Sequence, residues 1–298
     1  WYGLLIPQNH LEINSIAKLE AATDYAVMAL KSYMDKFFKY EKERWEVPRL
    51  EYAILDADNS NFVDEYTLTY AQQSAMDPKG DELDAFVAEM SAVLQANNGL
   101  DVYKKNFFRG KLVLFDFRSH LYAPLICLEK SNLKIQLAPV ALNTDEMRFV
   151  DYLKSYVDDH AAELAGKSLY LLRNKSKVGM GFFEAGNFYP DYILWIDTPA
   201  TQYISFIDPK GLMHIRPDDP KIEFHKTIKD LETRLSPTAD GKRIVLNSFI
   251  MAGTRSSDLR MWWSTPEVDA DRAYREARNV YTLDNDECVE SMMRKILQ

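Results

Sequence analysis

The chain has 298 residues, of which 47% are hydrophobic, and this is enough to bury a full core in one large or two modest domains. Its formal net charge of −9 argues against a broad basic face for nucleic acid, but it leaves room for a local one. The cysteines, Cys127 and Cys288, fit neither a disulfide framework nor a zinc cluster. The sequence has no apolar run of about 18 residues and no visible signal peptide, so it predicts a cytoplasmic protein without a membrane partner.

The first hundred residues carry no obvious chemistry. An apolar stripe of helical period predicts a helix over Glu12–Phe38, and such stripes are typical of core packing. Strands are expected over Leu50–Leu55 and Tyr66–Tyr70, followed by a helix over Glu82–Ala96. We interpret residues 1–102 as a helical α+β connecting region. Because the chain opens with Trp rather than Met, we expect it to be a piece of a longer polypeptide.

A second domain is predicted over residues 103–298. It opens with a mixture of basic and aromatic residues over Tyr103–Lys111, which suits nucleic acid or a solvated strand entry equally well. Further along, a helix is expected from Asp145 to about Ala165, with Asn143 or Thr144 as its cap. A second helix is expected over Ile222–Leu235, and a helical appendage over Asp271–Leu297. The expected strands are Leu112–Phe117, Tyr122–Leu128, Leu133–Leu137, Ser168–Leu172, Val178–Phe183, Phe188–Ile196, Gln202–Ile207 and Arg243–Met251.

Glu146 lies in the first turn of the helix that begins near Asp145. It precedes Phe149 and Val150 by three and four positions, so it projects from the apolar face. Its carboxylate either points into a functional site or completes a capping arrangement, and the sequence leaves both interpretations open.

Three charged residues belong to the two most apolar strands. Asp191 lies within the first strand, and Asp208 and Lys210 end the second, after a turn that contains Pro199. Buried charge without a partner is costly, so two carboxylates brought together require a positive group between them. A divalent cation with oxygen ligands meets this requirement, and Mg²⁺ is the expected one.

This arrangement matches the PD-(D/E)xK nuclease signature, with Pro190-Asp191 as the PD and Asp208-Pro209-Lys210 as the DxK. Asp77-Pro78-Lys79-Gly80 repeats the letters DPKG without an apolar strand before it, and we interpret that copy as a turn into a helix. The order helix, three or four strands, helix, strand resembles the α-β-β-β-α-β core of restriction-endonuclease-like proteins. The expected fold is therefore α/β, with a mixed central sheet flanked by helices.

The string YLLRNKSKVGMGFFEAGNFYPDYILWI, the later YISFIDPKGL and the upstream HLYAPL and ALNTDEMRFV together resemble the C-terminal region of DEAD/DEAH-box (superfamily 2) helicase proteins related to the Res subunit of type III restriction enzymes. The resemblance implies DNA as substrate and an N-terminal ATP-driven helicase motor of the same polypeptide as partner, with other defence-system subunits as further partners. No G-x-x-x-x-G-K-[ST] motif occurs here, so ATP would act only through a motor absent from this chain. The proline at the middle of the DxK departs from the usual pattern, but its carbonyl remains available as a ligand.

The resemblance implies a Mg²⁺-dependent endodeoxyribonuclease, with Mn²⁺ as a substitute. Asp191, Asp208 and the Pro209 carbonyl would bind the metal, and Lys210 would orient water or offset charge on the transition state. The additional catalytic acid is either Glu146 or Glu184. The DNA backbone is expected at a basic turn formed by Arg173, Lys175 and Lys177. The alternative is a catalytically inactive nuclease fold that serves as a DNA clamp or as an interaction module of a defence complex.

Overall fold

The computed structural model describes residues 12–46, 66–70, 78–95, 102–107, 110–115, 125–129, 135–175, 180–182, 188–213, 215–263 and 268–298. The chain divides into two compact units, Trp1–Leu55 and Asp56–Gln298. The predicted division between residues 102 and 103 stays a prediction. The predicted strand Leu50–Leu55 lies outside the described residues.

The first unit contains one long helix, α1 (Ile16–Glu46), which begins and ends later than the predicted range. The sequence predicted that its apolar stripe packs in a core. Instead, Ile16, Leu30 and Phe37 are exposed, as are several other large apolar residues of this helix. Among the described residues, no helix has the length and apolarity needed to cross a membrane.

The second unit begins with a small α+β part. Its helix α2 starts at Pro78, a favoured first helical residue, as the interpretation of the Asp77 copy as a helix entry predicts. Phe86 of α2 packs with Leu114 and Ile126 in a small apolar cluster. Strand β1 pairs with β5, and β2, β3 and β4 form an antiparallel sheet. The bounds are β1 Thr67–Tyr70, α2 Pro78–Gln95, β2 Val102–Phe107, β3 Gly110–Phe115, β4 Leu125–Glu129 and β5 Ile135–Ala138.

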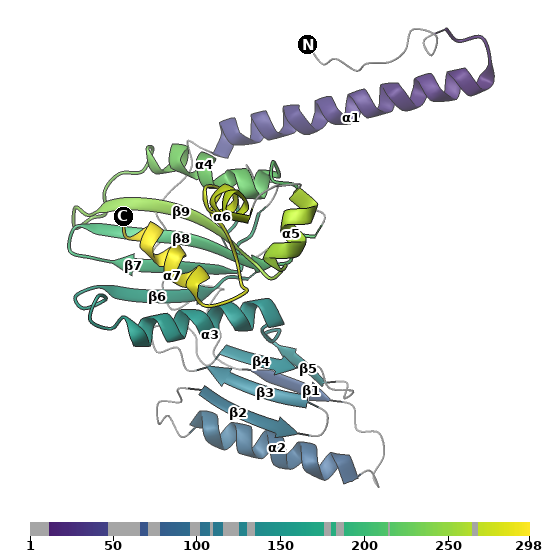
Figure 1. Ribbon diagram of the computed structural model, residues 1–298. Helices are drawn as coiled ribbons and strands as arrows, with labels where there is room; N and C mark the ends of the chain where they lie inside the picture. Colours follow the sequence, from purple (N-terminus) through teal and green to yellow (C-terminus); the bar gives the residue numbers. More distant parts are fainter. Residues whose placement is uncertain are drawn as a thin grey trace. The chain divides into compact units, whose positions relative to one another are not determined.

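The main sheet has five strands in the order β10-β9-β8-β7-β6 (Figure 1). Strands β6, β7 and β8 are antiparallel neighbours, whereas β9 is parallel to both β8 and β10, so the sheet is mixed. The strands are β6 Ser168–Arg173, β7 Tyr192–Asp197, β8 Thr201–Lys210, β9 Arg243–Ala252 and β10 Val280–Thr282.

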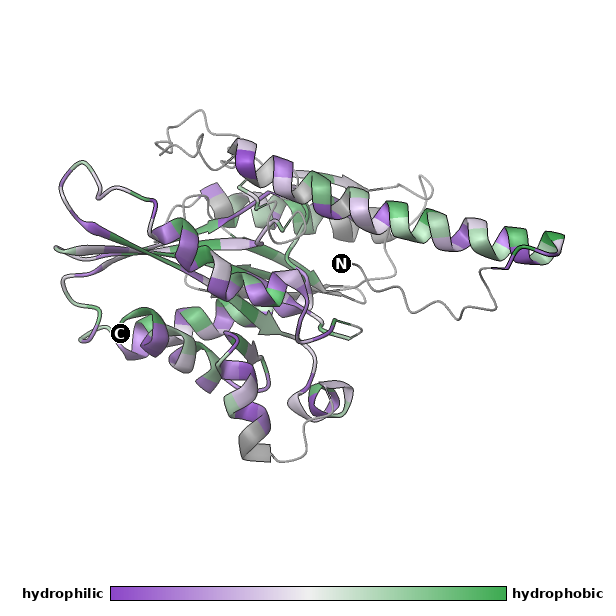
Figure 2. Ribbon diagram, turned by 90° about the horizontal axis from the view of Figure 1, so that it is seen from above, coloured by the Kyte–Doolittle hydropathy of each residue, from purple (hydrophilic) through white to green (hydrophobic). Residues whose placement is uncertain are grey.

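Helices cover both faces of this sheet. On one face, Phe149 of α3 contacts Tyr192 of β7, and α7 packs beside α3 (Figure 1). On the other face, Phe224 and Ile228 of α4 share a core with Ile193 and other strand residues. Figure 2 shows mostly hydrophobic strands beside helices that alternate in hydropathy. The helices are α3 Thr144–Asp159, α4 Pro220–Glu232, α5 Ser256–Trp263, α6 Val268–Glu276 and α7 Glu287–Ile296.

The element order from α3 to β9 is helix, three strands, helix, strand, which confirms the expectation of an α/β fold with a central mixed sheet flanked by helices. The prediction that Asp271–Leu297 is entirely helical is wrong, because β10 lies within it and extends the sheet. Asn279 makes possible the turn between α6 and β10, because it adopts a positive φ of 55°. Its side chain donates a hydrogen bond to the Ser248 carbonyl at 2.9 Å. A strand of three residues is too short to produce an alternating pattern in sequence.

Candidate functional site

Asp191 and Asp208 lie opposite one another at the ends of β7 and β8. The pairing of these strands places Tyr192 opposite Ile207, and the same register continued by one residue places Asp191 opposite Asp208. Directly opposed side chains on antiparallel strands have Cβ atoms about 5 Å apart. The two carboxyl groups form a hydrogen bond, so the structure brings together the acids that the hairpin pattern predicted.

Lys210 lies beside the aspartate pair, on the same strand as Asp208. Two residues beyond Asp208, it projects to the same side of β8, and its ammonium forms an ion pair with the Asp208 carboxylate. The ammonium also lies 5.4 Å from the centre of the buried Phe188 ring. The apolar core on the α4 side of the sheet therefore ends where these charged side chains begin.

Pro209 is accommodated because β7 has already ended. The pairing of β7 with β8 stops at Ile207, whereas the parallel pairing with β9 continues and places Pro209 beside Met251. Proline cannot donate a ladder hydrogen bond, so a strand segment that has a partner on one side only is the position that tolerates it.

The structure confirms the capping interpretation of Glu146, and its role in a functional site stays a prediction. It completes a capping box at the start of α3: its Oε2 accepts from the Asn143 backbone N–H at 3.2 Å, and the Asn143 side chain accepts from the Glu146 N–H at 2.9 Å. The same carboxylate, only 7% exposed, interacts electrostatically with Asp208 and Asp191. Burial raises the pKa of Glu146, and the neighbouring Arg173 guanidinium partly offsets this.

Arg173, at the end of β6, is engaged by the protein itself. Its Nη2 donates to Glu146 Oε2 at 2.9 Å and to the Ala141 carbonyl at 3.2 Å, and its Nη1 donates to the Val140 carbonyl. Lys175 is half-buried just beyond the strand. Lys177 and Glu184 lie outside the described residues. The contact of this basic turn with DNA stays a prediction.

Burial and the neighbouring acids raise the pKa of Asp191. The pKa of Asp191 rises to about 8, chiefly because the carboxyl is buried. The negative charge of Asp208 raises this pKa further, as does the hydrogen bond that the protonated Asp191 carboxyl donates to Asp208. The charge of Glu146 adds to the repulsion. The Lys210 ammonium acts in the opposite direction but offsets only part of the effect. Near neutral pH, Asp191 therefore holds a proton where a cation could bind.

Asn174 holds the chain at Asp191, and sequence reasoning missed it. Its Nδ2 donates to the Pro190 carbonyl at 2.8 Å and to the Met180 carbonyl at 2.7 Å, while its Oδ1 accepts from the Met180 N–H at 2.9 Å. Its own N–H donates to the Asp191 carbonyl at 2.7 Å. In sequence, Asn174 was one polar residue of a basic turn, and no local pattern indicates hydrogen-bond partners so far along the chain.

The donors at this site fit a magnesium ion in part. Mg²⁺ is usually held by one or two carboxylates while it keeps several waters, and Asp191 and Asp208 provide two such carboxylates. Among the described residues, no group of three or more His, Cys, Asp or Glu side chains is arranged to hold a metal ion. Glu146 is directed to Arg173 instead, so the fit depends on the two aspartates.

The arrangement combines two chemical capacities. The aspartate pair can exchange a proton for a cation, and the Lys210 ammonium can hold an anionic oxygen beside it. Comparisons with family models, with curated proteins and with solved structures find no match for this chain.

Proposed function

We propose that this chain is a Mg²⁺-dependent endonuclease domain that hydrolyses DNA phosphodiester bonds. The observation that carries the proposal is the convergence of Asp191, Asp208 and Lys210 at the adjacent ends of β7 and β8. Their order and strand positions fit the PD-(D/E)xK pattern, and the element order from α3 to β9 fits the core of that fold. Three charged side chains at one point cost desolvation energy, which a strand end with a purely structural role would avoid.

Asp191, Asp208 and the Pro209 carbonyl would hold the metal. An ion held by these residues would supply the Lewis-acid chemistry that polarises a phosphate and activates water. Burial and the nearby Asp208 charge raise the pKa of Asp191, so this carboxyl would have to release its proton to act as a ligand. Binding of a cation here would therefore be coupled to the release of a proton from Asp191.

Lys210 would bind the scissile phosphate. Its ammonium is only partly exposed and lies beside the Phe188 ring, which excludes water from one side of the charge. A charge in such surroundings attracts a phosphate oxygen more strongly than one in bulk water does. Glu146 is the additional acid in this proposal, because its carboxylate already acts electrostatically on Asp208 and Asp191.

The test is cleavage of plasmid DNA by the purified chain with Mg²⁺ or Mn²⁺, with a chelator as the blank. We expect Asp208→Asn and Lys210→Ala to lower the cleavage rate by about 100-fold or more while the proteins stay folded. Lys79→Ala alters the second DPKG copy, so it removes the same side chain in the same local sequence and is expected to retain the parent rate. Parent-like cleavage by Asp208→Asn or Lys210→Ala would overturn the proposal, as would a parent chain that cuts with neither metal.

A binding role without cleavage is the second candidate, and two ion pairs favour it. Glu146 is paired with Arg173 and Asp208 with Lys210, so the protein itself neutralises part of the charge at the site. The exposed apolar residues of α1 additionally fit a partner, such as the helicase motor or other defence-system subunits that the resemblance implies. DNA binding that persists in Mg²⁺ without any strand cleavage would support this candidate.

A further inference from the structure

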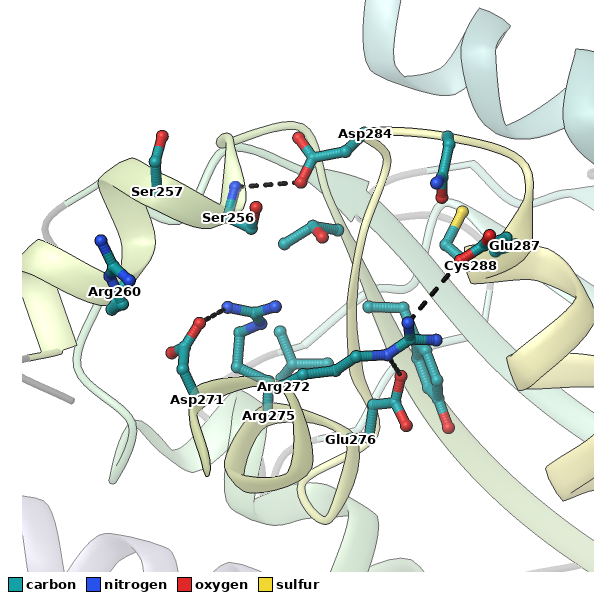
Figure 3. A pocket seen from close by; sticks show the side chains of 14 residues that line it. Ser256, Ser257, Arg260, Asp271, Arg272, Arg275, Glu276, Asp284, Glu287 and Cys288 are labelled. Carbon is teal, nitrogen blue, oxygen red and sulfur yellow. Dashed lines mark hydrogen bonds and ion pairs between the residues drawn. The ribbon is translucent and has the colours of Figure 1, made fainter. Parts of the chain in front are cut away.

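A second polar site lies at the C-terminal end of the chain, with no lining residue in common with the aspartate pair. It is a cavity of about 420 Å³ lined by residues of α5, α6, β10 and the start of α7 (Figure 3). Small-molecule sites in proteins typically have volumes of about 300–1,000 Å³. The cavity is therefore large enough for more than a single ion.

Arg275 supplies unused donors to this cavity. Its side chain is only 6% exposed, and its Nη1 donates to Asp271 one helical turn earlier. Within the described part of the chain, Asp271 is its only acceptor, although a guanidinium carries five N–H donors. Figure 3 shows this guanidinium projecting into the open part of the cavity. A buried cation with donors left over is costly unless a ligand accepts from them.

Arg260 brings a second guanidinium to the same cavity from another helix. It lies on α5, is half-buried, and has no acceptor among the residues that the structure describes. Arg272, in contrast, is already satisfied: its Nε donates to Glu276 at 2.8 Å, and its Nη1 lies 3.6 Å from Glu287. Among the described residues that line the cavity, Arg260 is therefore the cation without an ion pair, and Arg275 keeps N–H donors beyond the one that Asp271 accepts.

The acids of the cavity are largely committed. Glu276 and Glu287 are paired with Arg272, and Asp284 accepts from the Ser256 N–H at 3.1 Å. A compact anion between Arg260 and Arg275 would gain charge-assisted hydrogen bonds that these acids do not supply.

We propose that this cavity binds a phosphate monoester of about mononucleotide size, with the phosphate held between Arg260 and Arg275. The remaining volume accommodates the sugar or base that the phosphate carries. The proposal does not depend on the nuclease assignment, because it uses none of the residues at β7 and β8.

The test is titration calorimetry of the full chain with adenosine 5′-monophosphate and ribose 5-phosphate, with adenosine as the ligand that lacks the phosphate. We expect at least one of the two monoesters to bind, and adenosine to bind at least tenfold more weakly. Arg260→Gln is expected to weaken binding at least tenfold, whereas Arg234→Gln, an exposed arginine just after α4, serves as the matched control and leaves it unchanged. Asp208→Asn should also bind like the parent, which separates this cavity from the aspartate site.

The proposal would be overturned by failure of both monoesters to bind, by equal binding of adenosine, or by parent-like binding of Arg260→Gln. Displacement of the monoester by a short DNA duplex would instead assign the arginines to a polyanion and would equally refute it. Arg275→Lys keeps the charge beside Asp271 but removes the planar fork, and we expect at least fivefold weaker binding with an unchanged circular-dichroism spectrum.

Discussion

Replacing Asp191 with asparagine should stabilise the metal-free protein, and the gain should grow as the pH rises. The folded state raises the pKa of this carboxyl from 3.8 to about 8. Between these two pH values the folded chain binds a proton that the unfolded chain has already lost, so the stability of the parent falls as the pH rises through this window. The loss is absent below the unfolded pKa and complete above the folded one.

The size of the stability gain follows from the change in the pKa of Asp191 on folding. One unit of pKa corresponds to about 1.4 kcal/mol, so the full change sets an upper limit of about 6 kcal/mol at pH 8. Asp191 is half-buried, and water that reaches it screens part of the repulsion from Asp208. We therefore expect Asp191→Asn to raise the free energy of unfolding by about 2 kcal/mol near pH 8, and by much less near pH 5. Asparagine can still donate the hydrogen bond to Asp208.

Urea denaturation at the two pH values, with a chelator present, measures this difference. Asp230→Asn removes the same charge from the exposed side of α4 and should change stability by less than about 0.5 kcal/mol. Addition of Mg²⁺ should stabilise the parent but not Asp191→Asn, because only the parent keeps both carboxylates. A gain of equal size at both pH values, or a variant less stable than the parent near pH 8, would refute the electrostatic account.

Two further substitutions test how the site is held. Asn174→Ala removes the hydrogen bonds to the Pro190 and Met180 carbonyls and should cost about 2–3 kcal/mol in the free energy of unfolding, measured by urea denaturation; a cost below about 0.5 kcal/mol would show that these bonds do not hold the strand. Gly253→Ala would place a Cβ against the Asp145 carboxylate, which would have to move, and should lower the thermal midpoint by an amount equivalent to about 1–3 kcal/mol. Gly211→Ala, whose Cβ would meet its nearest atom at 3.8 Å, is the matched control and should be close to neutral.

The parts of the site that the sequence predicted are those encoded by nearby residues. The strands β7 and β8 are joined by a short turn, at which Thr198 Oγ1 donates to the Thr201 carbonyl at 2.8 Å. Because this turn sets the register, alternating side chains along two adjacent strands are enough to predict that Asp191 and Asp208 meet. The same local signals identified the start of α3 and the capping role of Glu146.

Features that depend on distant partners could not be predicted in this way. The pattern of α1 is that of a packed helix, but whether its apolar stripe is covered depends on what lies against it, and Leu19 and Phe37 are exposed. Strand β10 forms because β9 offers it an edge, with Tyr281 beside Met251. A short segment of this kind adopts a strand through its neighbour rather than through its own pattern.

Arg173 shows how such a distant partner changes a functional argument. In sequence it belongs to a basic turn with Lys175, and phosphate binding was the natural expectation. In the fold its guanidinium connects Glu146 with the carbonyls of Val140 and Ala141, so it stabilises the chain around the start of α3. A phosphate at this position would compete with Glu146 for the guanidinium, and a Glu146 carboxylate freed from Arg173 would add its charge to that of the aspartate pair. If Arg173 contacts DNA and the aspartates bind a cation, as we propose, the two binding events are energetically coupled.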